Sequence, residues 1–236
     1  MAPERRRRPE EHRHQAPDPS GAGSCPFCAG READAPGELL RIPSPDGSGW
    51  SVRVLPNKFA ALSPDEPAGE RLQGPLFREV AAAGHHEVIV EGPTHGRRTA
   101  DMADREVADA IEAYHSRYVA LRDDRRVAYV IVFKNSGARA GASLAHPHSQ
   151  LVATPMAPLG LQGRFARVRE HHAATGRCLC CDLVDAELEA AVRVVLETER
   201  YAVYCPFASG VPYETWIAPR RHQPSFGFTS REERVE

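Results

Sequence analysis

The chain has 236 residues, of which 42% are hydrophobic, and its formal net charge is −2. This length allows one large or two small domains with real cores, and the near-neutral charge argues against bulk binding of nucleic acid. No run approaches the roughly 20 apolar residues of a membrane span, and no apolar signal region follows the N-terminus. We therefore expect a cytoplasmic protein with neither membrane nor nucleic-acid partners.

The N-terminal stretch is polar and basic. Four consecutive arginines, Arg5 to Arg8, precede Pro9 and a stretch rich in His, Gln, Pro, Ser and Gly that runs to Gly23. Taken alone, such a run of charge is typical of a solvated flexible arm.

A CxxC motif follows the arm at Cys25-Pro-Phe-Cys28. Two thiolates from one tight turn can reach the same tetrahedral zinc ion. A redox pair is less consistent with the sequence, because no thioredoxin-like βαβ pattern surrounds the motif. The clustering of the six cysteines also favours metal ligation in a reducing cytoplasm over a disulfide framework. His95 is a candidate third ligand, and His146 or His148 is a candidate fourth.

Four segments of the middle region are predicted to be strands. Residues 50–55 alternate in polarity and end at a Pro-Asn turn, and residues 86–91 precede a Gly-Pro turn. Residues 127–133 form a valine-rich apolar run typical of a buried strand, and residues 150–153 form a short strand. The glycine pattern and strand–helix rhythm of a dinucleotide-binding fold are absent.

One amphipathic helix is predicted between the second and third of these strands. Its apolar residues recur at spacings of four and three from Val107 to Leu121, and Thr99 or Asp101 is expected to cap it. We expect its tyrosines, including Tyr114, to pack in the core. The order of elements predicts an α+β meander with the helix on one face of the sheet.

The segment 135–150, NSGARAGASLAHPHSQ, combines a glycine-rich turn with a His-Pro-His-x-Gln group. Glycines let backbone N–H groups approach phosphate oxygens closely. A neutral histidine is a competent nucleophile near pH 7 when its other ring nitrogen is held in one tautomer. The segment therefore indicates phosphate chemistry beside a metal site, and its simpler interpretation is a glycine turn with two surface histidines.

The second half of the chain echoes the first. Cys178-Leu-Cys-Cys181 resembles the first CxxC motif, and residues 213–217 followed by Pro219-Arg-Arg-His222 resemble residues 88–90 followed by Pro93-Thr-His95. This repetition predicts a possible second metal site at Cys178, Cys181 and His222. The alternative is that these cysteines are ordinary thiols.

Together these pieces resemble the galactose-1-phosphate uridylyltransferase family of the histidine-triad superfamily. The matching segments follow one another along nearly the whole chain: APERRRRP (2–9), CPFC (25–28), NKFAAL (57–62), HHEVIVEGPTH (85–95), FKNSGARAGASLAHPHSQ (133–150) and VPYETWIAPRRH (211–222). The related ADP-glucose phosphorylase type shares almost all of them.

The resemblance implies an α+β fold with a histidine-triad-like antiparallel sheet, flanking helices and a tandem repeat. Residues 1–163 would be the first repeat with its basic arm, and residues 164–236 an incomplete second copy. Compared with the family, we expect the chain to be cut short at both ends. Family members are usually homodimers whose sites borrow residues from the partner.

The resemblance also implies roles for individual residues. His148 would be the nucleophile, and zinc would be held by Cys25, Cys28, His95 and His146. The implied substrate-binding residues are Arg5, Arg8, Asn57, Asn135, Gly137, Gly141, Ala142, Ser143 and Gln150. The chain departs from the family at Lys58, where an acid is common, and this departure affects recognition of the base or ribose.

The implied reaction is a uridylyl exchange between UDP-glucose and galactose 1-phosphate through a nucleotidyl-histidine, so the partners would be a nucleotide sugar and a sugar 1-phosphate. Gln150 cannot act as a general acid or base, which favours transfer over hydrolysis.

Two alternatives stay open: an ADP-glucose phosphorylase-type adenylyltransferase and an inactive, truncated zinc-binding paralogue. A nucleic-acid-binding zinc module is disfavoured, because His95 and His146 lie far apart in the sequence.

Overall fold

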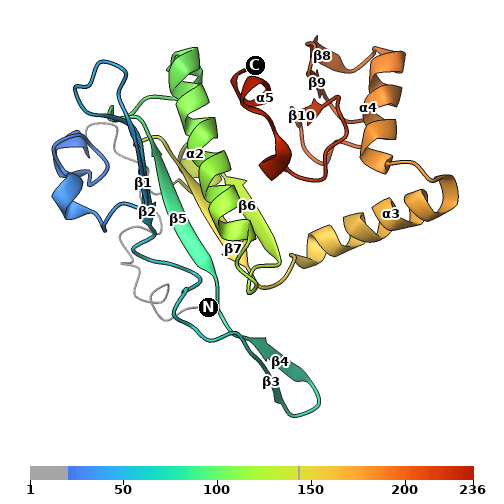
Figure 1. The fold of residues 1–236 in the computed structure, drawn as a ribbon, viewed down its shortest axis with the longest axis horizontal. Helices are drawn as coiled ribbons and strands as arrows, with labels where there is room; N and C mark the ends of the chain where they lie inside the picture. The colour runs from blue at the N-terminus through green and yellow to red at the C-terminus, as the bar shows by residue number, and fades with distance from the viewer. Residues whose placement is uncertain (1–20, 143) are drawn as a thin grey trace. The chain divides into compact units, whose positions relative to one another are not determined.

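The computed structural model describes residues 21–142 and 144–236, which fold into two compact units (Figure 1). The first unit ends at Met156, and the second covers Ala157–Glu236. Among the described helices, none is long and apolar enough to cross a membrane.

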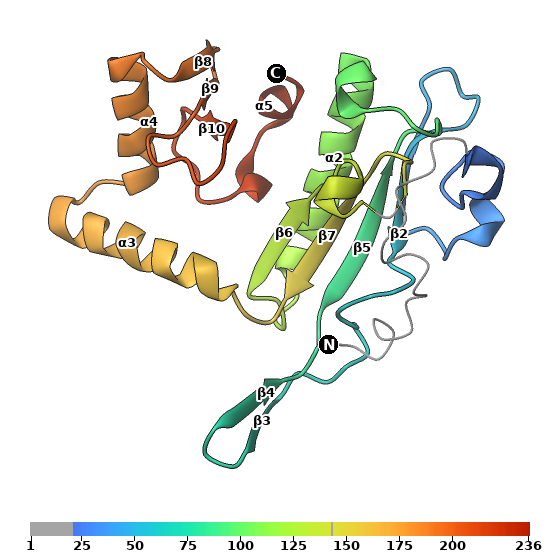
Figure 2. The same ribbon diagram turned by 180° about the vertical axis from the view of Figure 1, so that it is seen from behind.

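A five-stranded antiparallel sheet forms the centre of the first unit, with α2 (Asp104–Arg122) lying along one of its faces (Figures 1 and 2). From one edge to the other, its strands are β1 (Leu40–Pro43), β2 (Trp50–Pro56), β5 (His85–Glu91), β7 (His148–Thr154) and β6 (Tyr129–Phe133). A separate hairpin of β3 (Glu70–Gln73) and β4 (Phe77–Val80) extends from the loop between β2 and β5. Short 3-10 turns complete the unit: η2 (Gly21–Ser24), η3 (Glu32–Asp34), η4 (Thr99–Asp101) and η5 (Ala138–Ala140).

The two central strands β2 and β5 are buried on both faces. On the side of α2, the core contains Val54, Ile89 and Leu151 packed against small residues of the helix. On the other side, Leu55 and Val90 pack against apolar residues of the segment that carries the CxxC motif. The sheet therefore holds that segment against the face opposite α2.

Gly84 marks the entry to β5, where the backbone turns in a conformation that only glycine adopts readily. Its φ is +139°, and a Cβ at this position would lie 2.2 Å from the carbonyl oxygen of Ala153 on β7. The close pairing of β5 and β7 at this end therefore requires a residue without a side chain.

The predicted strands 50–55 and 86–91 are confirmed as β2 and β5. The predicted strand 150–153 is longer than expected, because β7 begins at His148 and carries both His148 and Gln150. The expectation that 127–133 is buried is wrong. Residues of β6 are only half-buried, because the strand lies at the edge of the sheet and pairs with β7 alone.

The predicted helix is confirmed as α2, but its predicted cap is wrong. The helix begins at Asp104, and the Glu106 carboxylate accepts a hydrogen bond from the Ala103 N–H at 2.8 Å. Thr99 and Asp101 belong to the separate turn η4, where the Asp101 carboxylate pairs with Arg98. Tyr114 packs against the core as expected.

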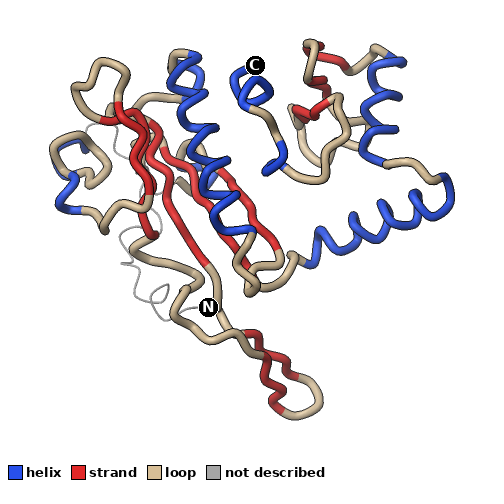
Figure 3. Tube along the Cα trace, in the orientation of Figure 1, coloured by secondary structure: helices blue, strands red, loops and turns tan. Residues whose placement is uncertain are grey.

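The second unit contains a three-stranded antiparallel sheet in the order β10-β9-β8. Its elements, coloured by type in Figure 3, are α3 (Leu159–Thr175), α4 (Leu179–Ala190), β8 (Val194–Glu197), β9 (Tyr201–Tyr204), β10 (Trp216–Pro219), η6 (Phe226–Phe228) and α5 (Arg231–Val235). Val184 of α4 packs on Ala202 and Tyr204 of β9. Of the segment 213–217 that resembles residues 88–90, only Trp216 and Ile217 belong to β10, and Tyr213 adopts a left-handed conformation with φ +63°. That this unit is a partial second repeat stays a prediction.

A buried ion pair joins α2 to the sheet. The Arg117 guanidinium donates to both carboxylate oxygens of Glu87, at 2.8 and 2.6 Å, and the Glu87 side chain is only 3% exposed. Hydrogen bonding to Glu87, with its charge, raises the pKa of Arg117, so the guanidinium stays charged.

We expect Arg117→Leu to destabilise the first unit by roughly 3–5 kcal/mol, because it leaves the Glu87 carboxylate buried without its cation. Chemical denaturation followed by circular dichroism measures this loss. The matched control is Arg122→Leu in the same helix, whose partner Asp123 is 78% exposed; it should cost less than about 1 kcal/mol. Equal losses in the two variants would contradict a structural role for the buried pair.

Candidate active site and metal centre

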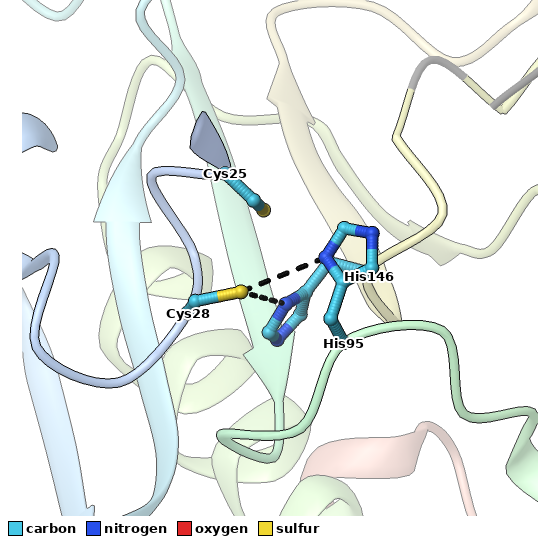
Figure 4. A group of neighbouring side chains, drawn as sticks. All are labelled: Cys25, Cys28, His95 and His146. Carbon is cyan, nitrogen blue, oxygen red and sulfur yellow. Dashed lines mark hydrogen bonds between the residues drawn. The ribbon is translucent and has the colours of Figure 1, made fainter. Parts of the chain in front are cut away.

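Four side chains from three separate segments converge on the face of the sheet opposite α2 (Figure 4). Cys25 and Cys28 come from one tight turn, His95 from the loop after β5, and His146 from the residues just before β7. Each offers one ligand atom, and these atoms all lie within 4.8 Å of one another. The Cys28 Sγ lies 3.6 Å from Nδ1 of His95 and 3.6 Å from Nδ1 of His146.

The ring of His146 is held in one orientation. Its Nε2–H donates to the Gly92 carbonyl at 2.8 Å, so Nδ1 presents its lone pair to the cluster. Burial lowers the pKa of His146 to about 4, which keeps the ring in the neutral form that ligates metals. Of the two candidates for the fourth ligand, His146 lies in the cluster and His148 does not.

The two thiols of the cluster provide the other half of the donor set. Cys25 is 3% exposed, and burial raises the pKa of its thiol to about 11. A thiolate at this position therefore requires a cation beside it. Two sulfur and two imidazole donors in one cluster fit the tetrahedral preference of zinc, and the cluster could hold one such ion.

His148, the first residue of β7, lies next to this cluster with a fixed tautomer. Its Nδ1–H donates to the carbonyl oxygen of His146 at 2.8 Å, which leaves the Nε2 lone pair available. Burial lowers the pKa of His148, so the ring stays neutral near pH 7. The Phe27 ring packs 5.5 Å from His148 and 6.0 Å from His146, measured between ring centroids.

A buried carboxylate supports the same segment from the side of α2. Glu91, 4% exposed, accepts hydrogen bonds from Tyr114 and Ser149 and pairs with Lys134. Its backbone N–H donates to the Pro147 carbonyl at 3.0 Å. Glu91 therefore holds the chain on both sides of His148. Sequence reasoning missed this network, because only the pairing of the strands brings its members together.

Three polar side chains meet beyond His148 on the same face of the sheet. Gln150 follows His148 by two residues, and Asn57 follows β2. Between them lies His86 of β5, whose Nε2 is 2.8 Å from Gln150 Oε1. The structure thus brings together two of the expected substrate-binding residues and adds His86, which the sequence analysis treated only as part of a strand.

The glycine-rich loop contains the other expected phosphate contacts. Gly137 and Gly141 have φ values of +79° and +81°, as tight turns require. The Ala142 N–H donates to the Gly137 carbonyl at 3.2 Å. The turn itself therefore uses this donor in the described conformation, and a contact of Ala142 with phosphate stays a prediction. Asn135 is half-buried at the end of β6.

Three expected substrate-binding residues, Arg5, Arg8 and Ser143, lie outside the described residues. Their roles stay predictions.

The second unit contains its own cluster of possible metal ligands. Cys178, Cys181 and His222 each offer one atom, all within 4.8 Å of one another, and Cys181 Sγ lies 3.3 Å from His222 Nδ1. A hydrogen bond from the Cys181 backbone at the start of α4 lowers the pKa of Cys178, which favours its thiolate. The cluster could hold a metal ion with three protein ligands.

The sequence of this chain is similar to a family model and to individual proteins of known activity. A family model described as "Galactose-1-phosphate uridyl transferase, N-terminal domain" matches residues 7–158. The ADP-glucose phosphorylase of Arabidopsis thaliana is 32% identical over 229 residues, which cover 96% of this chain and 64% of the relative. The galactose-1-phosphate uridylyltransferase of Thermotoga maritima is 29% identical over 212 residues, which cover 90% of this chain and 62% of the relative.

The fold is also similar to solved structures. The crystal structure of an ADP-glucose phosphorylase from Arabidopsis thaliana with bound ADP-glucose has a TM-score of 0.76 and 33% identity, and the match covers 90% of this chain and 64% of that chain. The chain therefore spans less than two thirds of the length of these relatives.

We expect Cys25→Ser to lower the zinc content of the purified protein by about one ion per chain and to reduce its melting temperature, because metal binding is coupled to folding. Elemental analysis and thermal denaturation measure the two effects. Cys205→Ser is the matched control, since Cys205 is a half-buried thiol outside both clusters. A Cys25→Ser protein with the zinc content of the control would rule out this ligand set.

Proposed function

Since this chain belongs to the galactose-1-phosphate uridylyltransferase family, we propose that it transfers a nucleotidyl group through a covalent intermediate on His148. One observation carries the proposal: the His148 ring is half-buried and neutral, and its Nδ1–H donates to the His146 carbonyl. Such a ring directs the Nε2 lone pair to a substrate without prior loss of a proton.

The reaction proceeds in two displacements at phosphorus. Nε2 of His148 attacks the α-phosphorus of a nucleotide sugar, so a P–N bond forms while the P–O bond to the sugar 1-phosphate breaks. A phosphate oxygen of a second sugar 1-phosphate then attacks the same phosphorus, and the P–N bond breaks. The leaving group of the first displacement is a phosphate anion, and that of the second is the neutral His148 ring, which keeps its proton on Nδ1. Neither displacement therefore needs an external acid.

Gln150 supports transfer rather than hydrolysis. It stands two residues after the nucleophile, where an acid–base group would activate water, and an amide cannot take that role. Its polar group instead suits hydrogen bonding to the nucleotidyl phosphate. The glycine-rich loop with Asn135, Gly137 and Gly141 would contribute further contacts to the phosphates, with Ser143 and the N-terminal arginines.

Two nucleotide sugars are candidate donors of the nucleotidyl group. The family reaction is a uridylyl exchange between UDP-glucose and galactose 1-phosphate. The second candidate is an adenylyl transfer from ADP-glucose, which is favoured by the similarity to the Arabidopsis thaliana ADP-glucose phosphorylase over 96% of the chain. Lys58, next to Asn57, differs from the acid common in the family and would contribute to this choice.

Cys25, Cys28, His95 and His146 would hold zinc, which would fix the segments around the nucleophile. Cys178, Cys181 and His222 would hold a second ion in a partial second repeat. We further propose a cytoplasmic homodimer.

The main test is covalent labelling. The wild-type protein, incubated separately with UDP-glucose and ADP-glucose carrying 32P at the α-phosphorus, should acquire label on His148 with one of the two. His148→Gly should acquire none, while its zinc content stays unchanged, because His148 is not in the metal cluster. His172→Ala, an exposed histidine of α3, should label like the wild type.

Label retained by His148→Gly would refute the nucleophile assignment. Zinc-loaded wild-type protein that takes label from neither nucleotide sugar would instead favour the inactive paralogue.

A separate prediction concerns the N-terminal arginines. Arg5→Ala combined with Arg8→Ala should weaken nucleotide-sugar binding at low salt by roughly tenfold or more, since a charged hydrogen bond to phosphate contributes about 1.5–3 kcal/mol. Titration calorimetry measures the affinity. Arg6→Ala with Arg7→Ala is the matched control and should have a much smaller effect. Equal losses in the two double variants would mean that the run acts only as a general positive patch.

A further inference from the structure

We propose that His86 is a positioning residue that fixes the orientation of the Gln150 amide beside the nucleophile. This inference rests on the proposed nucleotidyl transfer at His148. Neither the sequence motifs nor the family resemblance marks His86 as part of the site. Its position in the structure indicates such a role, because His86 lies between the two amide side chains that are expected to contact the substrate.

The protonation of the His86 ring follows from its neighbours. Its Nδ1 lies 3.0 Å from the backbone nitrogen of Ala61, which is a donor, so Nδ1 must be the acceptor. A neutral imidazole with an acceptor at Nδ1 carries its proton on Nε2. The Nε2–H then donates to Gln150 Oε1 at 2.8 Å.

The orientation of Asn57 is fixed by its own turn. Its Oδ1 accepts a hydrogen bond from the Phe59 N–H at 2.9 Å, so its NH₂ group is the end that faces the other two side chains. This NH₂ lies 3.4 Å from Gln150 Oε1 and 3.0 Å from His86 Nε2. The contact with Gln150 joins a donor to an acceptor. The shorter contact with His86 joins two donors and therefore adds no hydrogen bond.

Gln150 can satisfy both neighbours in only one of its two amide orientations. Its Oε1 has two lone pairs, and it accepts from His86 and from Asn57. A reversed amide would place its NH₂ group against two donors. His86 and Asn57 therefore keep the carbonyl end of Gln150 on their side and turn its NH₂ group the other way.

This orientation has a chemical consequence for transfer. Gln150 and His148 lie two residues apart on one strand, so their side chains share a face of the sheet. An NH₂ group is a donor that suits a phosphoryl oxygen, whereas the carbonyl end would repel it. His86 is only 6% exposed and is held in place by the strand pairing, so it can fix this choice before substrate binds.

The experiment is a double-mutant cycle on the rate of covalent labelling. His86→Phe keeps a planar ring and removes the donor. At saturating nucleotide sugar, it should slow single-turnover labelling of His148 by roughly tenfold or more, the scale of one lost hydrogen bond to a fixed group. In a Gln150→Ala background, the same substitution should change the rate by less than about twofold, because the amide it positions is gone.

His85→Phe is the matched control. His85 is the adjacent histidine of β5, and its Nε2 pairs with Asp124 at 3.0 Å instead of with the site. It should leave the labelling rate unchanged. All variants should retain the metal content of the wild type.

Two results would overturn the proposal: an unchanged rate in His86→Phe, or an equal slowing in the presence and absence of the Gln150 side chain. The ring itself provides a measurement that needs no variant. Nitrogen-15 NMR of the wild-type protein should show His86 as the neutral Nε2–H tautomer, and an Nδ1–H or doubly protonated ring would overturn the assignment. Failure of the wild-type protein to take label would refute the proposed function. The NMR measurement does not depend on activity, so the tautomer of His86 would still test the orientation of the Gln150 amide.

Discussion

The antiparallel pairing of β5 with β7 is the constraint on which the site depends. In this register Val90 pairs with His148, and Val88 pairs with Gln150. Leu151 is fully buried against α2, so His148 and Gln150 must point to the opposite face. A slip of one residue would turn the histidine into the core and expose the leucine, so core packing sets the direction of the His148 side chain.

The other face of the sheet links the cluster of candidate metal ligands to His148. Trp50 and Leu55 pack with Phe27, which lies between Cys25 and Cys28, so burial of apolar surface brings the thiols over the strands. The carbonyl oxygen of His146 then holds the His148 ring. His146 therefore orients the His148 ring through its backbone carbonyl, and its side chain remains in the cluster of candidate metal ligands.

Local patterns were sufficient to predict the elements but not the contacts between them. The helical spacing from Val107 to Leu121 corresponds to α2, because burial of one helix face sets that spacing. Residues 50–55 correspond to β2, which is buried on both faces. The helix start was mispredicted, since Glu106 binds back to the Ala103 N–H and no typical capping residue is used.

The site could be predicted where its residues form short motifs. The members of the CxxC pair and of the His-Pro-His-x-Gln group are close in sequence, and the structure brings the two cysteines and His146 together with His95. His86 and Glu91 have no such signal. Their partners, Gln150 and Ser149, are 64 and 58 positions away, and only the strand register reveals that they touch.

The wide separation of the cluster residues also determines when the metal centre can form during folding. Cys28 and His146 are 118 positions apart, with the hairpin, α2 and four strands of the sheet encoded between them. Closing so long a loop is entropically costly, and contacts of this range form late. The CxxC turn alone supplies only two ligands, so full coordination must wait for sheet assembly. An ion bound by this cluster would therefore stabilise an already folded unit, and it would slow unfolding more than it accelerates folding.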